Sequence, residues 1–310
     1  MIAPLTIAAR NEERAIGPCL DSVLEAIAHA QRRLPVEIEP LVVLDDCTDG
    51  TARVVESRGV AFLRSSGGKV EAQRRGLRPG DCALFVDADV VLARETLAAM
   101  LELLRARPEV QVVSPPLEPL PPRRRSRLAR ALHVYNARRG FSSRPSWFNG
   151  RCFAVRRWEL PDRAELAGRI ARLPRDPFYR FEEGLRVDDV HLSRRIAALH
   201  GPSAFAEAPE GPVRYRAPET LRGMYRYYLR LRRELERESL LFPELEPAHR
   251  RFGSRRADLL ARAPAGERLA YLEFQAWLLL CRLGYRADRF AQRHLGLRRD
   301  AWLPIEETKR

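Results

Sequence analysis

The stretch CALFVDADVVL, residues 82–92, decides the fold class of this chain. Apolar residues run on both sides of Asp87 and Asp89, a pattern typical of a buried strand with two acids at its end. A carboxylate in apolar surroundings costs several kcal/mol unless it is paired or bound to a metal. Positions two apart on a strand face the same way, so the pair predicts a bound cation. Oxygen ligands favour Mg²⁺ or Mn²⁺.

Strand and helix signals alternate from the start of the chain to this stretch and beyond it. Apolar runs occur at 5–9, 41–44, 60–63, 83–86 and 110–114, and helical patterns at about 13–33, 51–58, 69–78 and 94–107. This alternation predicts an α/β fold, with a mostly parallel sheet flanked by helices. Ligands bind such sheets outside the carboxyl ends of the strands. Three of the runs are followed by polar clusters, ARNEE, DDCTDGT and DAD, which predict one binding edge.

The second half of the chain has a different organisation. Prolines and arginines in SPPLEPLPPRRRSR (114–127) interrupt the alternation, and a basic helix is expected from there to about residue 140. FNGRCFAVRR (148–157) predicts a turn into a strand, and EEGLRVDDVHLSRRI (182–196) a loop into a helix. Helical patterns follow at 218–241, 244–262 and 266–284. We therefore expect an α/β domain over 1–215 and a helical C-terminal region over 216–310.

Composition excludes several classes of protein. The chain of 310 residues is 45% hydrophobic, yet it contains no run of about 18 apolar residues, the length that a bilayer-spanning helix needs. The start, MIAPLTIAARNEE, lacks the basic segment of a secretory signal, so we expect a cytoplasmic protein. The five cysteines stand far apart with no C-x-x-C pair, which argues against a zinc cluster or a disulfide framework.

The charge balance is strongly basic. The formal net charge is +14, and of the 55 basic residues only Lys69 and Lys309 are lysines. So strong a preference for arginine indicates in part a coding habit, which weakens the case for nucleic acid as a partner. Anionic small molecules or an anionic membrane face fit better. The run RRRSRLAR (123–130) is either a solvated face or a docking site on lipid at the inner face of the membrane.

Two further segments lie at predicted strand ends. In LDDCTDGT (44–51), Asp49 and Thr51 are expected to cap the following helix, which leaves Asp45 or Asp46 to accept a hydrogen bond from a nucleobase. In SSGGKVEAQRRG (65–76), Lys69 stands at the start of a helix, where it suits a phosphate. Neither a P-loop nor a G-x-G-x-x-G fingerprint is present.

The motifs TIAARNEE, LDDCTDGT, GGKVEAQRRG and FVDADV together resemble the family 2 glycosyltransferases of GT-A (Rossmann-like) fold, inverting enzymes that use nucleotide-diphosphate sugars. The resemblance is specific over 5–92 and looser to about 196. It implies that Asp87 and Asp89 form the metal motif. One departure is the absence of the proline that such enzymes usually show near Ala9. The implied nucleotide-sugar site consists of Ala8, Arg10, Glu12, Asp45 or Asp46, Lys69, Arg74 and Asp87.

The resemblance also suggests the catalytic base. RVDDVHLSRRI (186–196) is similar to the family's acidic pair before a helix with L-x-x-R, which makes Asp189 the base and leaves Asp188 as the alternative. In the competing interpretation either acid caps the helix. Asn149 and Gly150 resemble an acceptor-side segment, or form a plain turn. The chain lacks the Q-x-x-R-W motif of membrane-bound polymerising members.

These observations predict a metal-dependent inverting glycosyltransferase that moves a single sugar from a UDP- or GDP-sugar to a hydroxyl acceptor. The acceptor is either a small molecule or lipid-linked. A nucleotidyltransferase is the first alternative, although it would show a glycine- and arginine-rich signature at the first strand end. A non-catalytic protein that binds nucleotide sugars or anionic membranes is the second, and for it the substitution Asp189→Asn would have no effect.

Overall fold

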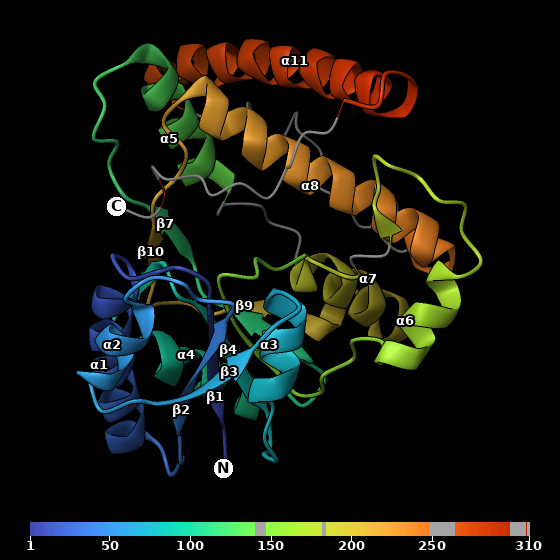
Figure 1. Cartoon of the computed structure of the whole chain (residues 1–310). Coiled ribbons are helices and arrows are strands. Elements are labelled where there is room, and N and C mark those ends of the chain that lie inside the picture. Colours follow the sequence, from blue (N-terminus) through green and yellow to red (C-terminus); the bar gives the residue numbers. More distant parts are fainter. Residues whose placement is uncertain (140–146, 182–183, 248–263, 298–307, 309–310) are drawn as a thin grey trace.

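The computed structural model describes residues 1–139, 147–181, 184–247, 264–297 and 308. A seven-stranded sheet in the order β3-β2-β1-β4-β8-β6-β9 occupies the half of the molecule that holds the N-terminus (Figure 1). Strands β1 to β4 pair in parallel, and β8 runs antiparallel to both β4 and β6. The mostly parallel α/β sheet is thus confirmed. Its strands are β1 Leu5–Ala9, β2 Pro40–Asp45, β3 Ala61–Ser65, β4 Ala83–Asp87, β6 Val112–Ser114, β8 Cys152–Val155 and β9 Phe205–Glu207.

A second sheet of three strands, in the order β5-β10-β7, was not expected from the sequence. Its strands are β5 Val90–Leu92, β7 Leu117–Pro119 and β10 Val213–Tyr215, each of three residues. Runs this short carry too little alternation to be recognised. Because β5 belongs to this sheet, the stretch 82–92 forms two strands in two sheets rather than one strand, with Ala88 and Asp89 in the turn between them.

Helices cover both faces of the large sheet. Helices α1 and α4 share one core with the apolar side chains of β1 and β4, and α7 packs on the opposite face. The helices are α1 Ile16–Arg33, α2 Thr51–Glu56, α3 Lys69–Gly76, α4 Thr96–Ala106, α5 Arg127–Arg139, α6 Arg163–Ile170, α7 Asp188–His200, α8 Leu221–Leu241 and α11 Ala265–His294, with short 3₁₀ turns at Pro202–Ala204 and Pro243–Leu245.

The alternation of side chains along β4 positions the polar edge. Leu84 and Val86 belong to the core with α1 and α4, whereas Ala83 and Phe85 belong to the core under α7. The Phe85 ring stacks on Phe153 of β8, with 5.0 Å between ring centroids. Asp87, the last residue of β4, continues the row of Ala83 and Phe85. Its side chain therefore lies on the face covered by α7.

The other half of the molecule is helical and contains α5, α8 and α11 (Figure 1). The predicted helix over 266–284 continues to His294, and the one predicted over 244–262 lies almost entirely outside the described residues. Helix α5 packs against α11, where the rings of Tyr135 and Phe274 stack at 3.7 Å. Residues 127–139 therefore share a core with the C-terminal helices, and the division at 215 stays a prediction. Within the described ranges, no helix combines the length and apolarity that a bilayer crossing requires.

Candidate active site

Lys69 stands at the centre of a group of acids at the carboxyl edge of the sheet. It begins α3 after Gly68, whose φ of +92° suits glycine and turns the chain from β3 into the helix. Its Nζ lies 2.7 Å from Asp87 Oδ1 and 3.2 Å from Asp188 Oδ1. Burial opposes the ammonium charge, but the attraction of Asp188 and Asp87 outweighs it and raises the pKa of Lys69. The cation that faces Asp87 within the protein is therefore this lysine.

Asp188 is the buried member of the acidic pair and is 1% exposed. Its Oδ2 accepts a hydrogen bond of 2.7 Å from Gln73 Nε2, while Oδ1 pairs with Lys69. Both partners come from α3, so Asp188 joins the start of α7 to α3 across the sheet edge. The Asp188 carboxylate therefore favours the charged form of Lys69 and holds α7 against α3.

Asp189 differs from its neighbour because it is half-buried. Its Oδ2 accepts a hydrogen bond of 3.0 Å from the Gly150 N–H, and Oδ1 accepts none from any described residue. Burial and the adjacent Asp188 raise the pKa of the Asp189 carboxyl to about 6, although Lys69 opposes them. Helix α7 begins without a side-chain cap, so the interpretation of either acid as an N-cap is wrong.

The segment 149–151 brings Gly150 between the acids and the lysine. The Gly150 carbonyl accepts a hydrogen bond of 3.2 Å from Lys69 Nζ, while its N–H donates to Asp189. Asn149 Oδ1 accepts from both the backbone N–H and the guanidinium of Arg151. The Arg151 guanidinium carbon lies 3.9 Å from the centre of the Tyr215 ring, a cation–π arrangement.

Arg151 and Gln73 are site residues that the sequence analysis missed. The backbone carbonyl of Arg151 accepts a hydrogen bond of 2.7 Å from the Asp87 N–H. The negative charges of Asp87 and Asp89 attract its guanidinium. Burial opposes that charge, but these acids and two tyrosines raise the pKa of Arg151. The only signal available in the sequence was that both residues lie within motifs already singled out.

Gly150→Ala tests this packing. A Cβ added at Gly150 would lie 3.0 Å from Asp189 Cβ and 3.1 Å from its Cγ. We expect a loss of about 1–2 kcal/mol in the free energy of unfolding, because the added methyl overpacks the contact. Turnover should fall by roughly tenfold or more, because displaced catalytic groups lose much of their effect. Denaturant unfolding and a turnover assay measure the two effects.

Gly168→Ala is the matched control, because a Cβ at this α6 glycine meets no atom within 4 Å. There alanine should stabilise by about 0.5–1 kcal/mol through its higher helix propensity. Equal stability and turnover for Gly150→Ala and the wild type would show that the contact with Asp189 is not needed.

A second polar group lies at the end of β2. Asp45 is buried, and its Oδ1 accepts a hydrogen bond of 3.0 Å from Gly68 N–H, while Arg10 Nη1 lies 3.5 Å from Oδ2. Burial raises the pKa of Asp45 in spite of these two donors. Asp46 is exposed, with a φ of +46°. Of the two acids left open by the sequence, the structure builds only Asp45 into the sheet edge.

The remaining residues of the predicted nucleotide-sugar site fall into two groups. Ala8 lies in β1 between Val43 and Asp87, and the N–H of Glu12 donates to Thr51 Oγ1, so both are at the same edge as Asp45. Arg74 is directed elsewhere. Its guanidinium bonds the Glu71 carboxylate at 3.0 Å and the Pro161 carbonyl at 2.8 Å.

Asp49 was expected to cap α2 together with Thr51. The helix begins after Gly50 without a side-chain cap. Asp49 instead accepts hydrogen bonds from the N–H of Thr51 and from the N–H of Glu13. The pair thus ties the loop after β2 to the loop after β1, so its role is structural, as expected, but is not that of a helix cap.

The two acids of the metal motif fit a hard divalent cation. The expected alternation along one strand does not apply, because Asp89 lies in the turn after β4. Asp87 bonds Lys69 through Oδ1, and none of the described residues bonds its Oδ2. No cluster of three or more His, Cys, Asp or Glu side chains suited to a metal occurs among the described residues. Mg²⁺ is commonly held by one or two carboxylates together with substrate phosphates, which matches this donor set.

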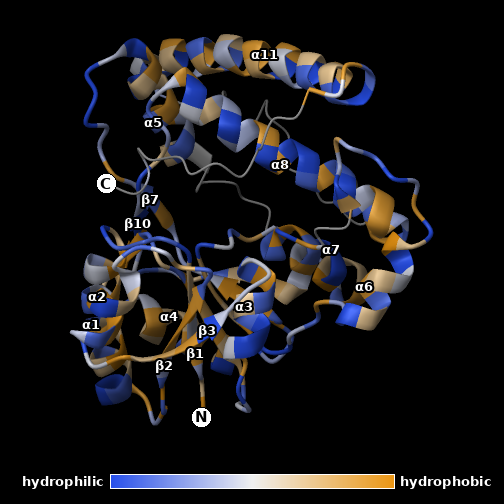
Figure 2. Cartoon of the chain, viewed as in Figure 1, coloured by the Kyte–Doolittle hydropathy of each residue, from blue (hydrophilic) through white to orange (hydrophobic). Residues whose placement is uncertain are grey.

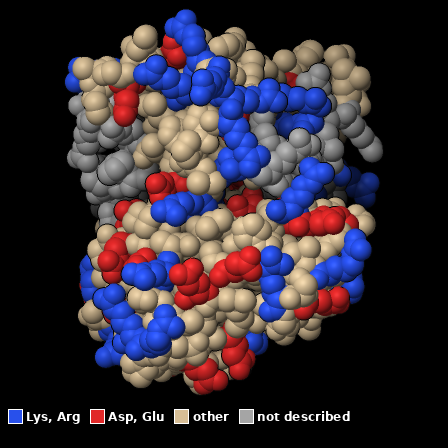
Figure 3. Space-filling model, turned by 90° about the vertical axis from the view of Figure 1, so that its left-hand side faces the viewer, with Lys and Arg blue, Asp and Glu red and all other residues tan. Residues whose placement is uncertain are grey.

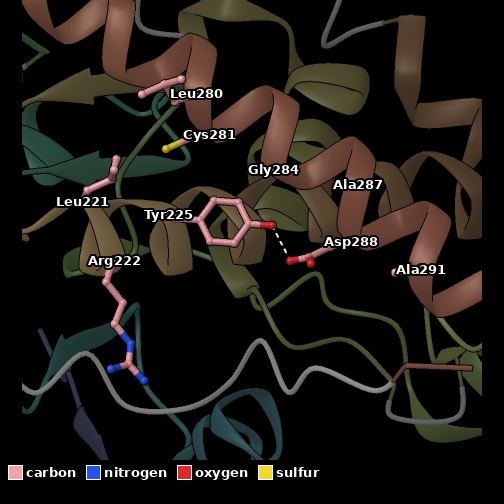
Figure 4. Close-up of a pocket in the computed structure, with 9 residues that line it drawn as sticks. All are labelled: Leu221, Arg222, Tyr225, Leu280, Cys281, Gly284, Ala287, Asp288 and Ala291. Atoms are coloured by element: carbon pink, nitrogen blue, oxygen red, sulfur yellow. Dashed lines mark hydrogen bonds between the residues drawn. The ribbon is translucent and has the colours of Figure 1, made fainter. Parts of the chain in front are cut away.

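A separate pocket of about 530 Å³ lies between α8 and α11. Figure 4 shows Tyr225 pointing across it toward Asp288, to which its hydroxyl donates a hydrogen bond. Leu221, Leu280 and Cys281 also line the wall. None of the residues around Lys69 contributes to this pocket, so it is distinct from the acidic site.

Comparison with known proteins identifies the family of this chain. The model of the family "Glycosyl transferase family 2" matches residues 5–165, just over half of the chain. A search of curated proteins gives no significant match. The mannosyltransferase PcManGT from Pyrobaculum calidifontis shares 21% identity with a TM-score of 0.51, over 92% of this chain and 87% of its own.

Two further solved structures are more distant. Glucosyl-3-phosphoglycerate synthase from Mycobacterium tuberculosis shares 17% identity with a TM-score of 0.47, over 79% of this chain and 80% of its own. TarS from S. aureus shares 16% identity with a TM-score of 0.43, over 88% of this chain and 79% of its own. The mannosyltransferase supports the GT-A fold, and the family model decides the assignment: this chain belongs to glycosyl transferase family 2, the enzymes that transfer a sugar from a nucleotide-sugar.

Proposed function

We propose that the chain is a metal-dependent, inverting hexosyltransferase that moves a single sugar from a UDP- or GDP-sugar to a hydroxyl acceptor, either a small molecule or a lipid-linked one. The observation that carries the proposal is the contrast between the two acids of α7. Asp188 is buried against Lys69 and Gln73, whereas Asp189 is half-buried with a pKa of about 6. One acid thus holds the site together, and the other suits a general base.

The donor end of the site is assigned to the edge formed by β1, β2 and β4. Strands β2 and β4 flank β1, so their ends lie about 10 Å apart, two strand spacings. Asp45 is placed to accept a hydrogen bond from the nucleobase, with Arg10 beside it. Lys69 pairs with Asp87 at the end of β4 and would bind the diphosphate.

Asp87 and Asp89 would hold Mg²⁺ or Mn²⁺ together with phosphate oxygens of the donor. When bound, the metal neutralises charge on the departing diphosphate. The structure of the Pyrobaculum mannosyltransferase contains GDP-Man and Mn²⁺, which supports this class of donor and metal for the fold.

The chemistry at the acceptor end rests on Asp189. Its carboxylate takes the proton of the acceptor hydroxyl while that oxygen forms a bond to the anomeric carbon of the sugar. The bond from this carbon to the diphosphate breaks with its electron pair on the diphosphate, so a single in-line displacement inverts the configuration. Gly150 positions the Asp189 carboxylate, and Asn149 lies beside it on the acceptor side.

The family assignment favours this activity over both alternatives considered from the sequence. Neither a nucleotidyltransferase nor a non-catalytic binding protein accounts for a family match over residues 5–165. Contact with an anionic membrane is compatible with glycosyl transfer and stays a separate proposal.

Calorimetric titration with UDP, GDP, ADP and TDP tests the donor site. In Mn²⁺ we expect one diphosphate to bind, and EDTA should abolish the binding. Asp89→Ala should weaken it roughly a hundredfold, because the loss of a metal ligand removes several kcal/mol of charge stabilisation. The preferred diphosphate then identifies the donor class.

Glu56→Ala is the control for a lost negative charge, since Glu56 is exposed at the end of α2. Its affinity should match that of the wild type. If none of the four nucleotides binds, with metal or without, the assignment of Asp87 and Asp89 to a metal–diphosphate site is wrong.

A further inference from the structure

Helix α11 presents a row of exposed apolar side chains along its outer side. Leu269 is 63% exposed and Phe290 59%, values far above those of core residues. The spacing of 269, 272, 279, 283 and 290 repeats three- to four-residue and seven-residue steps, which keeps the row on one side of the helix. The α11 outer face is formed by Leu269, Leu272, Leu279, Leu283 and Phe290.

The other side of α11 accounts for the stability of the helix. Phe274, Leu278 and Cys281 are buried against α5 and α8, and Tyr285 packs among the aromatic residues near α8. Helix α11 therefore has one face packed in the core and a second apolar face that is exposed. The helix lies at the end of the molecule farthest from the N-terminus (Figure 2). A contiguous exposed apolar surface of this kind marks a contact with a partner or a membrane.

The exposed charged side chains of α11 are basic, although one of them, Arg293, pairs with Asp176. Arg268, Arg286 and Arg293 are exposed on α11, whereas its three acids are buried or half-buried. Of these acids, Glu273 pairs with Arg127 and Asp288 bonds Tyr225. An apolar row flanked by arginines is the composition of helices that lie in the interface of anionic bilayers.

Helix α5 extends the positive charge. Residues 123–130 carry five exposed arginines, and the ion pair between Arg127 and Glu273 joins this run to α11. Figure 3 views the side of the molecule that bears α5, and Lys and Arg outnumber Asp and Glu over its upper, helical part. In the lower part of the same view the two signs alternate.

We propose that the α11 outer face, together with the neighbouring arginines, docks this protein on an anionic lipid surface. A second copy of the chain is disfavoured as the occupant, because each copy carries a formal charge of +14 and would bring the same arginines together. An anionic bilayer supplies an apolar interior for the exposed Leu279 and Leu283 and negative charge for the exposed Arg286. The proposal does not depend on the reaction assigned to the acids around Lys69.

Vesicle flotation of the full chain tests the proposal. The wild type should float with vesicles of equimolar phosphatidylcholine and phosphatidylglycerol, and not with phosphatidylcholine alone. Leu279→Glu/Leu283→Glu should reduce partitioning roughly a hundredfold, because two half-exposed leucines no longer enter the bilayer. Arg286→Gln should reduce it about fivefold, the contribution of one basic residue near an anionic surface.

Leu199→Glu/Leu240→Glu is the matched control, because these leucines are exposed on α7 and α8, outside α11. It makes the same change of charge and should float as the wild type does. Unchanged circular dichroism and thermal unfolding of both variants show that the fold is retained. The proposal is wrong if the wild type does not float with anionic vesicles. It is also wrong if light scattering detects a dimer of the wild type and Leu279→Glu/Leu283→Glu dissociates this dimer, because the outer face is then a contact between two copies.

Discussion

Asp189→Asn is expected to lower the rate of sugar transfer by roughly 10²–10⁴-fold, the usual contribution of a general base. Asparagine retains the size of the side chain and can still accept the hydrogen bond from the Gly150 N–H, but it cannot take up a proton at neutral pH. The affinity for the donor nucleotide should stay within about twofold of the wild type, because the change affects the transition state and not the ground state.

The measurement is the release of nucleoside diphosphate from the donor that the titration identifies, with water or a hydroxyl compound as acceptor. Asp162→Asn is the control, because Asp162 caps α6 through a hydrogen bond from Glu165 N–H and asparagine caps equally well. Unchanged turnover in Asp189→Asn would remove this residue from the mechanism. Lost donor binding would instead place Asp189 in the donor pocket.

The pH profile provides a second check on the same base. The pKa of Asp189 is raised from 3.8 to about 6, so the reactive carboxylate predominates only above pH 6. We expect kcat/KM to fall on the acid side with an apparent pKa near 6, and this limb to disappear from the residual activity of Asp189→Asn.

The raised pKa also has a consequence for stability. A carboxyl whose pKa is higher in the folded state stabilises the fold below its unfolded pKa of 3.8, and this contribution is lost as the pH rises through about 6. At neutral pH the ionised Asp189 therefore costs free energy of folding. Asp189→Asn should accordingly be more stable than the wild type at pH 7 while being nearly inactive, which separates loss of catalysis from loss of fold.

The sequence predicted the sheet where the apolar runs were long enough to carry a pattern. Strands β1 to β4 and helices α1 to α4 lie within a few residues of their expected ranges, because each strand comes from a run of four or five mostly apolar residues that is followed by an amphipathic helix or a turn. The three-residue strands of the second sheet went unseen. Their pairing of residues near 91, 118 and 214 depends on contacts between distant segments, and no local pattern records such contacts.

The site was predicted as a set of motifs but not as a network of contacts. Asp87, Asp188 and Lys69 were each singled out, yet no pattern in the sequence pairs this lysine with the acids 18 and 119 positions away. Asp45 is buried and Asp46 is exposed, and this difference arises only when the strands pack together. Arg74 was expected at the donor, whereas its guanidinium bonds Glu71 and the Pro161 carbonyl in the structure, so its part in the donor site stays a prediction.

Replacing Lys69 by methionine is the second change with a large expected effect. Its ammonium group is the partner of both Asp87 and Asp188, and the latter is only 1% exposed. Removing one partner of a buried ion pair costs up to about 5 kcal/mol, and the 30% exposure of the Lys69 side chain places the expected loss nearer 2–3 kcal/mol. Chemical denaturation measures the loss, and Arg75→Met, an exposed cation of the same helix, should change the stability by less than about 1 kcal/mol.

The origin of this loss can be separated from simple loss of packing. If the cost comes from acids left without a cation, it should shrink at acid pH, where the Asp87 carboxylate, whose pKa is raised by burial, takes up a proton in the variant. It should also shrink in the double variant Lys69→Met/Asp188→Asn, because asparagine carries no charge but still accepts the hydrogen bond from Gln73. A loss that is independent of pH and unchanged by Asp188→Asn would show that Lys69 acts through its aliphatic stem. In that case Asp87 would need a cation other than this lysine even before the donor binds.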